Sequence, residues 1–282
     1  MANILIFDSG MGGLSVYREL SKRIPAQQYL YLFDNAYFPY GELSEPRLVA
    51  RVVELFSTFV KQHSVDIAVI ACNTASTYVL PALRAQLSIP IVGVVPAIKP
   101  AAEYSRQHQT LAKPAHIGLL ATPGTISRRY TAELVQSFAP DIQVSMLGTT
   151  ELVKMAEDKL AGLPVDIKRL KQILAPWSGN RGPDTLVLGC THFPLLATEI
   201  NQCLPQVKLI DSGAAIARRV SYLLLQPACT LSQELAPEGK AGLLFCTELT
   251  KKALQQARAF KKEGFSELNC FEPNLNKLLK EQ

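Results

Sequence analysis

The stretch VDIAVIACNTAS, residues 65–76, is the clearest indication of the fold. A run of aliphatic residues ends at Cys72, which is followed by an amide and a hydroxyl. The stretch PDTLVLGCTHFP, residues 183–194, repeats the arrangement with Cys190, Thr191 and His192. A short continuous apolar run bounded by turn residues is typical of a strand that is buried on both faces. The two stretches therefore predict buried parallel strands, each ending at a cysteine beside small polar groups.

Similar apolar runs recur along the whole chain. They lie at residues 3–7, 29–33, 66–71, 90–95, 116–121, 142–147, 185–189 and 207–210. Helical patterns separate them, and the clearest spans residues 45–63, where apolar residues recur at i, i+3, i+4 spacing. Alternation of this kind predicts an α/β fold, in which parallel sheets carry helices on both faces.

The order of these features repeats. Three pairs of matching residues lie at similar separations: 113 positions for Ile4 and Ile117, 117 for Asp34 and Glu151, and 118 for Cys72 and Cys190. We therefore expect two similar parallel-sheet α/β domains related by pseudo-symmetry. The first would comprise residues 1–97 and 208–282, and the second residues 98–207. Residues 89–100 would cross between them, and the tail would add a strand at 242–246 and a helix at 249–260.

Composition excludes several classes of protein. No apolar run approaches the ~20 residues of a membrane span, and no secretory signal precedes the first strand, so we expect a cytoplasmic protein without a membrane partner. The net charge is +5, but the basic residues are scattered pairs such as Arg128–Arg129, which argues against a nucleic-acid partner. The four histidines lie far apart and there is no C-x-x-C motif, so we expect no metal site.

Polar residues follow the predicted strands at one end of each sheet. They are Asp8, Ser9, Asp34, Cys72, Asn73, Thr74, Thr122, Cys190, Thr191 and His192. Open parallel sheets bind their ligands beyond the carboxyl ends of the strands. Two domains facing each other would bring these residues around a single cleft.

The two strand-end cysteines can act on opposite faces of one carbon atom. A thiol ionises near pH ~8.5, and nearby donors lower that value. A thiolate on one side could remove a proton while a thiol on the other side delivers one, which inverts a stereocentre. The other cysteines lack this combination of polar neighbours and repeated position, and we expect them to be ordinary buried side chains: Cys203, Cys229, Cys246 and Cys270.

Three further motifs allow a structural or a ligand-binding interpretation. The glycines of DSGMGG, residues 8–13, can expose backbone N–H groups to a carboxylate or form only a tight turn. FPYG, residues 38–41, can close over a ligand or be a plain turn. Thr122 and Thr125 can donate to an anion, although their spacing favours helix capping. The second DSG, residues 211–213, predicts an ordinary N-cap.

Five motifs, in order, are similar to those of the glutamate racemase family. They are FDSGMGG (7–13), PYG (39–41), ACNTAS (71–76), TELV (150–153) and GCTHFPLL (189–196). The resemblance covers residue 4 to about residue 213. It implies a cofactor-independent amino-acid racemase that supplies D-glutamate for bacterial peptidoglycan, with the active site between two α/β domains. L- and D-glutamate would be its substrates.

The resemblance also implies residue roles. Cys72 would deprotonate D-glutamate with help from Asp8, and Cys190 would deprotonate L-glutamate with help from His192. Glu151 would lie near the substrate ammonium group or near His192. The remaining substrate-binding residues would be Ser9, Tyr40, Gly41, Asn73, Thr74, Thr191, Thr122 and Thr125, the last two beside the α-carboxylate.

Alternatives remain open from the sequence. An aspartate racemase of the same superfamily would carry Glu rather than His after the second GCT and a different glycine-rich opening. Thiol redox chemistry would favour a C-x-x-C motif. A non-catalytic two-lobed binding protein would not need paired cysteines and is often secreted. The resemblance also leaves a homodimer open, because relatives pair in different ways.

Overall fold

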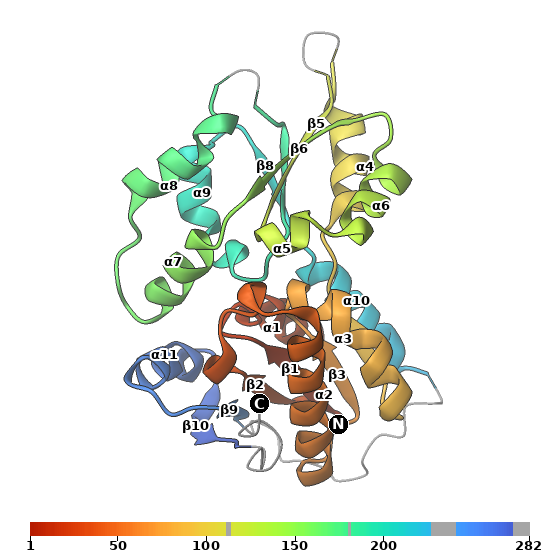
Figure 1. The fold of residues 1–282 in the computed structure, drawn as a ribbon, viewed down its shortest axis with the longest axis vertical. Coiled ribbons are helices and arrows are strands. Elements are labelled where there is room, and N and C mark those ends of the chain that lie inside the picture. Colours follow the sequence, from red (N-terminus) through yellow and green to blue (C-terminus); the bar gives the residue numbers. More distant parts are fainter. Residues whose placement is uncertain (111–113, 180–181, 227–240, 273–282) are drawn as a thin grey trace.

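The computed structural model describes residues 1–110, 114–179, 182–226 and 241–272, which form two α/β domains stacked along the long axis of the molecule (Figure 1). The first domain, the lower one in Figure 1, holds a parallel sheet in the order β10-β9-β2-β1-β3-β4. The second domain holds a parallel sheet in the order β6-β5-β7-β8. The described pairings are parallel throughout, as predicted for the fold class.

The strands of the first domain are β1 (Asn3–Asp8), β2 (Gln28–Phe33), β3 (Ile67–Ile70), β4 (Ile91–Gly93), β9 (Gly242–Cys246) and β10 (Phe265–Cys270). Its helices are α1 (Leu14–Arg23), α2 (Glu45–Gln62), α3 (Asn73–Gln86), α10 (Gly213–Leu224) and α11 (Lys251–Lys262), with the short 3-10 turns η1 (Asn35–Tyr37) and η2 (Tyr40–Glu42).

The strands of the second domain are β5 (His116–Ala121), β6 (Gln143–Gly148), β7 (Thr185–Leu188) and β8 (Lys208–Ile210). Its helices are α4 (Ile98–His108), α5 (Pro123–Ile126), α6 (Arg129–Phe138), α7 (Glu151–Leu160), α8 (Ile167–Leu174) and α9 (Ala197–Cys203), with the 3-10 turns η3 (Ala175–Trp177) and η4 (Phe193–Leu196).

The central strands of each sheet, β1 and β3 in the first and β5 and β7 in the second, are buried on both faces because they are largely apolar. In β1, Ile4 and Ile6 face one apolar cluster, whereas Leu5 and Phe7 face another. Helices α1 and α10 contribute to the first of these clusters, and α2 and α3 to the second. Successive side chains of a strand point to opposite faces, so an unbroken apolar run requires helices on both sides.

The two sheets share one topology. Strands β2-β1-β3-β4 of the first sheet correspond in order to β6-β5-β7-β8 of the second. The same place after the third strand of each set is occupied by Cys72, after β3, and by Cys190, after β7. The expected internal repeat is therefore present, and it places the two cysteines equivalently.

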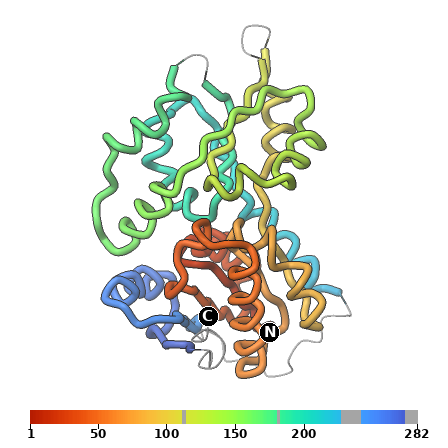
Figure 2. Tube along the Cα trace, viewed as in Figure 1, coloured from red at the N-terminus to blue at the C-terminus, as the bar shows by residue number. Residues whose placement is uncertain are grey.

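The chain crosses between the domains twice (Figure 2). The first crossing joins β4 to α4, within the predicted residues 89–100. The second follows β8, which pairs with β7, so the second domain extends to Ile210 and the predicted boundary at residue 207 is three residues too early. Strand β10 was not expected. The predicted tail strand and helix are β9 and α11.

The domains are not separated by a polar gap. One apolar cluster includes Met11 and Leu14 of the first domain together with Leu152 and Phe193 of the second. Burial of this apolar surface holds the two domains together, with the carboxyl ends of the strands of each sheet directed toward the other domain. Within the described ranges, no helix has both the length and the apolar character needed to cross a membrane.

Candidate active site

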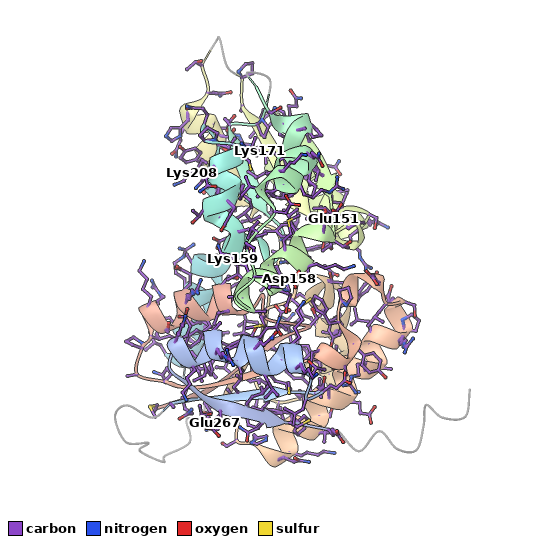
Figure 3. All side chains as sticks on the ribbon, turned by 90° about the vertical axis from the view of Figure 1, so that its left-hand side faces the viewer. Glu151, Asp158, Lys159, Lys171, Lys208 and Glu267 are labelled. Carbon is purple, nitrogen blue, oxygen red and sulfur yellow. The ribbon has the colours of Figure 1, made fainter. Side chains whose placement is uncertain are left out.

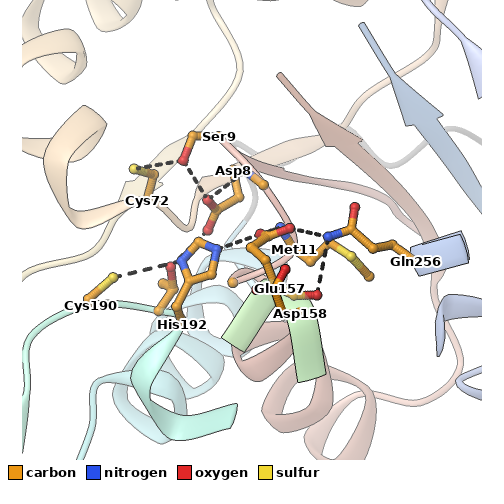
Figure 4. Close-up of polar contacts among 12 residues, drawn as sticks. Asp8, Ser9, Met11, Cys72, Glu157, Asp158, Cys190, His192 and Gln256 are labelled. Carbon is orange, nitrogen blue, oxygen red and sulfur yellow. Dashed lines mark hydrogen bonds and ion pairs between the residues drawn. The ribbon is translucent and has the colours of Figure 1, made fainter. Parts of the chain in front are cut away.

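The two strand-end cysteines lie in one pocket between the domains (Figure 4). Cys72 follows β3 and is the N-cap residue of α3, and Cys190 follows β7 just before η4. Both are buried, with exposed fractions of 7% and 8%, yet each contributes to the pocket wall. Topology brings them together, because each cysteine ends a strand whose carboxyl end faces the other domain.

The pocket contains almost every site residue expected from the sequence. Its predicted lining residues are Ser9, Tyr40, Gly41, Cys72, Asn73, Thr74, Thr122, Thr125, Cys190, Thr191 and His192. Pro39, Thr150 and Val153 also line it and were not expected. Asp8 lies behind the wall, and Glu151 lies outside.

A chain of polar contacts leads from Cys72 to Asp8. The Ser9 hydroxyl lies 3.9 Å from Cys72 Sγ and donates to Asp8 Oδ1 at 3.3 Å. Thr191, from the second domain, donates to Asp8 Oδ2 at 2.9 Å. Burial raises the pKa of Asp8, although the charge of His192 and the bond from Thr191 oppose the shift. Burial and the nearby Asp8 carboxylate also raise the pKa of Cys72, which favours its protonated thiol.

Cys190 has a different environment. His192 Nδ1 lies 3.8 Å from Cys190 Sγ, and His192 Nε2 lies 2.7 Å from Glu157 Oε1. Burial alone would lower the pKa of His192, but its bonds to Cys190 and Glu157 raise that pKa well above the usual value. The imidazole is therefore held as a cation between a sulfur and a carboxylate, an arrangement that stabilises negative charge on sulfur.

Glu157 is the buried carboxylate on which this arrangement depends. Besides His192, it accepts the backbone N–H of Met11 at 2.7 Å and a hydrogen bond from the Gln256 side chain on α11. Burial alone would raise its pKa, but the bond and charge of His192 outweigh burial and lower it. Met11 and Gln256 belong to the first domain, so Glu157 also joins the two domains.

The expected position of Glu151 is corrected by the structure. Glu151 begins α7 at the surface, where it forms an ion pair with Arg169 at 2.7 Å (Figure 3). It therefore contacts neither His192 nor the pocket in which a substrate ammonium group would lie. Glu157, nearly two turns further along α7, lies beside His192 instead. The sequence carried a signal for it, because Leu152, Val153 and Ala156 are the apolar face of α7 and Glu157 interrupts this face with a charge.

The glycines of residues 8–13 leave room for side chains of the second domain, which lie very close to the backbone of this loop. A Cβ on Gly10 would collide with Glu157, and a Cβ on Gly12 would collide with His192 and with Thr191 Oγ1, the latter at 2.6 Å. The loop does expose an N–H group to a carboxylate, but that carboxylate is the protein's own Glu157. The motif thus lets Glu157, Thr191 and His192 of the second domain pack against the first domain's backbone.

Tyr40 is held in the pocket wall from behind. Its hydroxyl donates to Asp34 Oδ2 at 2.7 Å, and Asp34 also forms a buried ion pair with Arg51 at 2.7 Å. Thr247, after β9, donates to Asp34 Oδ1 at 2.6 Å. Asp34 therefore acts through Tyr40, and the C-terminal segment contributes to the site at a place where no motif indicated it.

Several groups are placed to hold a small zwitterion. Asn73 and Thr74 open α3, whose positive N-terminal end lies at the pocket. Asn73 Oδ1 is buried and has no hydrogen-bond partner in the described part of the chain, which leaves an acceptor for an ammonium group. Thr122 caps α5 and its hydroxyl lies 3.0 Å from that of Thr125, so this pair is both a cap and part of the wall.

The remaining cysteines differ from the expectation in part. Cys246 is buried as predicted, Cys203 is partly exposed and Cys270 is exposed, whereas Cys229 lies outside the described residues. Asp211 accepts the backbone N–H of Gly213 at 2.7 Å and Ser212 is the N-cap of α10, as expected for the second DSG. Among the residues that the structure describes, no cluster of His, Cys, Asp and Glu side chains could hold a metal ion.

Comparison with known proteins gives a consistent result. The model of the family described as Asp/Glu/Hydantoin racemase matches residues 4–220. A glutamate racemase from Aliivibrio fischeri is 51% identical over 95% of this chain and 97% of its own length. A glutamate racemase from Vibrio cholerae is 56% identical over 78% of this chain and 80% of its own length.

Solved structures agree. The crystal structure of Escherichia coli glutamate racemase in complex with L-glutamate and the activator UDP-MurNAc-Ala has a TM-score of 0.88 and 46% identity, covering 96% of this chain and 98% of that one. A glutamate racemase isoform from Bacillus anthracis has a TM-score of 0.76 and 30% identity, covering 96% of this chain and 97% of that one. These similarities confirm the predicted fold class and the resemblance drawn from the five motifs.

Proposed function

The chain belongs to the Asp/Glu/hydantoin racemase family, and from this premise we propose that it interconverts L- and D-glutamate by a two-base mechanism with Cys72 and Cys190. The observation that carries the proposal is that two cysteines from different domains line one pocket. A single base could return a proton only to the face from which it came. Two thiols on opposite sides can remove it from one face and deliver another to the opposite face.

The resting site is asymmetric, which is what a two-base reaction needs at its start. The raised pKa of Cys72 favours a neutral thiol that can donate a proton. Cys190 lies beside the His192 cation, which can balance negative charge on that sulfur. In the direction from L-glutamate, Cys190 takes the α-proton as a thiolate and Cys72 delivers its proton to the other face. Cys190 ends as the thiol and Cys72 as the thiolate, which is the starting state for D-glutamate.

The carbanion formed between these steps must be stabilised. Pocket hydroxyls of Thr74, Thr122 and Thr125 and the N-terminus of α3 can donate hydrogen bonds to the substrate carboxylates. The Asn73 carbonyl oxygen can accept from the ammonium group, whose retained charge also stabilises the carbanion. Enclosure between the domains strengthens each of these interactions by excluding water.

The cellular setting follows from the same chemistry. The mechanism needs two reduced thiols, which a cytoplasmic location would maintain. D-glutamate made there would serve peptidoglycan synthesis. A homodimer is compatible with this mechanism, because Cys72 and Cys190 belong to the same chain.

Racemisation in heavy water tests the mechanism. Starting from L-glutamate without added pyridoxal phosphate, D-glutamate formed in early turnover should carry deuterium at the α-carbon, because the delivering thiol has exchanged with solvent. D-glutamate that keeps its original protium would overturn the two-base proposal. Aspartate, run in parallel, should be a poor substrate, and equal turnover of aspartate would overturn the assignment to glutamate.

Cysteine variants test the assignment of the bases. Cys72→Ala and Cys190→Ala should each abolish racemisation, since the loss of either thiol leaves one face without a proton donor or acceptor. Cys246→Ala is the matched control: Cys246 is the last residue of strand β9, but it is buried in the core of the first domain. Racemisation that survives in either of the first two variants, in protein with a normal circular dichroism spectrum, would contradict the assignment.

A further inference from the structure

The basic pair Arg128–Arg129 has no part in the chemistry described so far, but its first member spans the two domains. The Arg128 guanidinium lies over the ring of Tyr78, with Cζ 3.1 Å from the ring centroid. Arg128 is the N-cap residue of α6 in the second domain, whereas Tyr78 lies on α3 in the first. Both side chains are half-buried. A guanidinium placed over an aromatic ring is attracted by dispersion and by the ring quadrupole.

Both partners lie close in sequence to residues of the substrate pocket. Tyr78 is four residues after Thr74, so both side chains lie on one face of α3. Arg128 is three residues after Thr125, and its Nε donates to the carbonyl oxygen of Gly124 at 3.1 Å. The contact therefore ties the Thr122–Thr125 turn of one domain to the helix that starts at Cys72 in the other.

Helix α5 and the turn η2 lie side by side at this place. A Cβ on Gly124 would make an ordinary van der Waals contact, at 3.8 Å, with the carbonyl oxygen of Gly41 in η2. Helix α5 also contacts α3. Glu45, at the start of α2, lies close enough for its negative charge to oppose the lowering of the Arg128 pKa by burial. The cation is thus held at the junction of α3, α5 and η2.

We propose that Arg128 is a positioning residue of the racemase: its cation–π contact with Tyr78 clasps the two domains beside the pocket and holds the Thr122–Thr125 turn over bound glutamate. This rests on the proposed function, because the bound molecule is taken to be glutamate. Separation of the two domains would break the clasp. The clasp therefore favours the closed complex, and it affects binding more than the chemical step, which belongs to the cysteines.

Steady-state kinetics of matched variants test the clasp. Arg128→Ala should raise KM for both enantiomers by about three- to thirtyfold, the range that a partly desolvated cation–π contact provides, while kcat changes by less than about threefold. Arg128→Lys should recover part of the loss, since it keeps the charge. Arg129→Ala is the control, because Arg129 is exposed and pairs with Glu133 along α6. It should leave KM within about twofold of wild type.

A second pair of variants examines the other partner. Tyr78→Phe keeps the aromatic face and should keep the wild-type KM, whereas Tyr78→Leu should raise KM in the same sense as Arg128→Ala. The double variant Arg128→Ala/Tyr78→Leu should be no worse than Arg128→Ala alone, because that single substitution already removes the contact with Tyr78. If Arg128→Ala fails to fold, the Tyr78 pair decides alone.

The outcomes that overturn the clasp are distinct from failure of the proposed function. An unchanged KM in Arg128→Ala, an equal rise in Arg129→Ala, equal behaviour of Tyr78→Phe and Tyr78→Leu, or a loss confined to kcat would each overturn it. All of these are measured relative to wild-type protein that racemises glutamate in the same assay. Wild-type protein without racemase activity would instead overturn the proposed function.

Discussion

Two buried carboxylates of this site, Asp8 and Glu157, carry opposite pKa shifts for reasons that can be traced to single neighbours. Both lose water on folding, which favours the neutral acid. For Glu157 this effect of burial is outweighed, because His192 bonds to the carboxylate directly and Met11 donates a backbone N–H to it, and its pKa is lowered. Asp8 has the Thr191 hydroxyl and a more distant His192, and burial prevails. The site therefore holds one carboxylate charged beside an imidazolium and biases the other toward its protonated form.

Replacing the charged carboxylate tests this balance. Glu157→Gln should lower kcat by at least about tenfold, because the imidazolium is lost as an acid–base partner of Cys190. The sign of the pH effect follows from the raised pKa of His192. Without the carboxylate that pKa falls, so the alkaline decline of kcat/KM should begin at a lower pH. The measurement is a pH–rate profile in both directions.

The matched control for this prediction lies on the same helix. Glu151→Gln removes a surface ion pair with Arg169, and both of these side chains are close to half exposed. It should change kcat by less than about twofold and leave the pH profile in place, since exposed pairs contribute little. Equal effects of the two substitutions, or a wild-type profile in Glu157→Gln, would contradict the role given to Glu157.

At the scale of elements, the β1–α1 loop is the part of the fold that most directly limits the site. Gly12→Ala would bring a methyl group to 2.7 Å from His192 Cε1 and 2.6 Å from Thr191 Oγ1, closer than such atoms approach in folded proteins. We expect kcat/KM to fall more than about tenfold, because His192 or Thr191 must move, and stability to fall by about 1–3 kcal/mol. Kinetics and urea unfolding measure the two effects.

A second glycine separates backbone strain from damage to the site. Gly162, just after α7, has φ +94° and nothing within 4 Å of the position of its absent Cβ. Gly162→Ala should therefore cost about 1–2 kcal/mol through the left-handed backbone alone and leave kcat/KM unchanged. A comparable loss of activity in both variants would show that general destabilisation, and not contact with His192, explains the first result.

Elements were easier to predict from the sequence than the positions of individual polar side chains. Strands such as β3 and β7 are unbroken apolar runs, and burial on both faces makes such runs conspicuous. Strand β10 cannot be predicted in this way, because FSELNC is largely polar and lies at the sheet edge. The TELV motif points to Glu151 and not to Glu157, because a short motif does not show which face of the helix is buried. Contacts between distant segments, such as Gln256 with Glu157, leave no local pattern at all.

At the scale of the whole molecule, the site is part of the contact that joins the domains. Glu157 connects His192 with Met11 and Gln256, and Lys252 on α11 pairs with Asp158 at 2.7 Å. The apolar cluster beneath them runs through both domains. Stability and protonation of the site are therefore linked, because the same groups that carry the chemistry are buried when the chain folds.

This linkage predicts how stability changes in alkaline solution. A thiol in the unfolded chain ionises near pH ~8.5, whereas the raised pKa of Cys72 keeps it protonated in the folded protein. Above pH ~8.5 the folded chain therefore binds more protons than the unfolded one, and the free energy of unfolding falls by up to about 1.4 kcal/mol per pH unit from this group. Tyr31 and Tyr40 act in the same sense, but only above pH ~10, where an ordinary tyrosine ionises.

Urea unfolding of wild type and Cys72→Ala at intervals between pH 7.5 and 10 isolates the contribution of Cys72. Cys246, whose pKa burial raises to about 12, adds a similar slope to both proteins and cancels in the comparison. The variant should lose stability less steeply above pH ~8.5, with a difference approaching 1.4 kcal/mol per pH unit near pH ~9.5. Parallel curves would mean that Cys72 ionises equally in the folded and the unfolded protein. The difference between the two thiols, which sets the direction of the first proton transfer, would then have to come from the substrate.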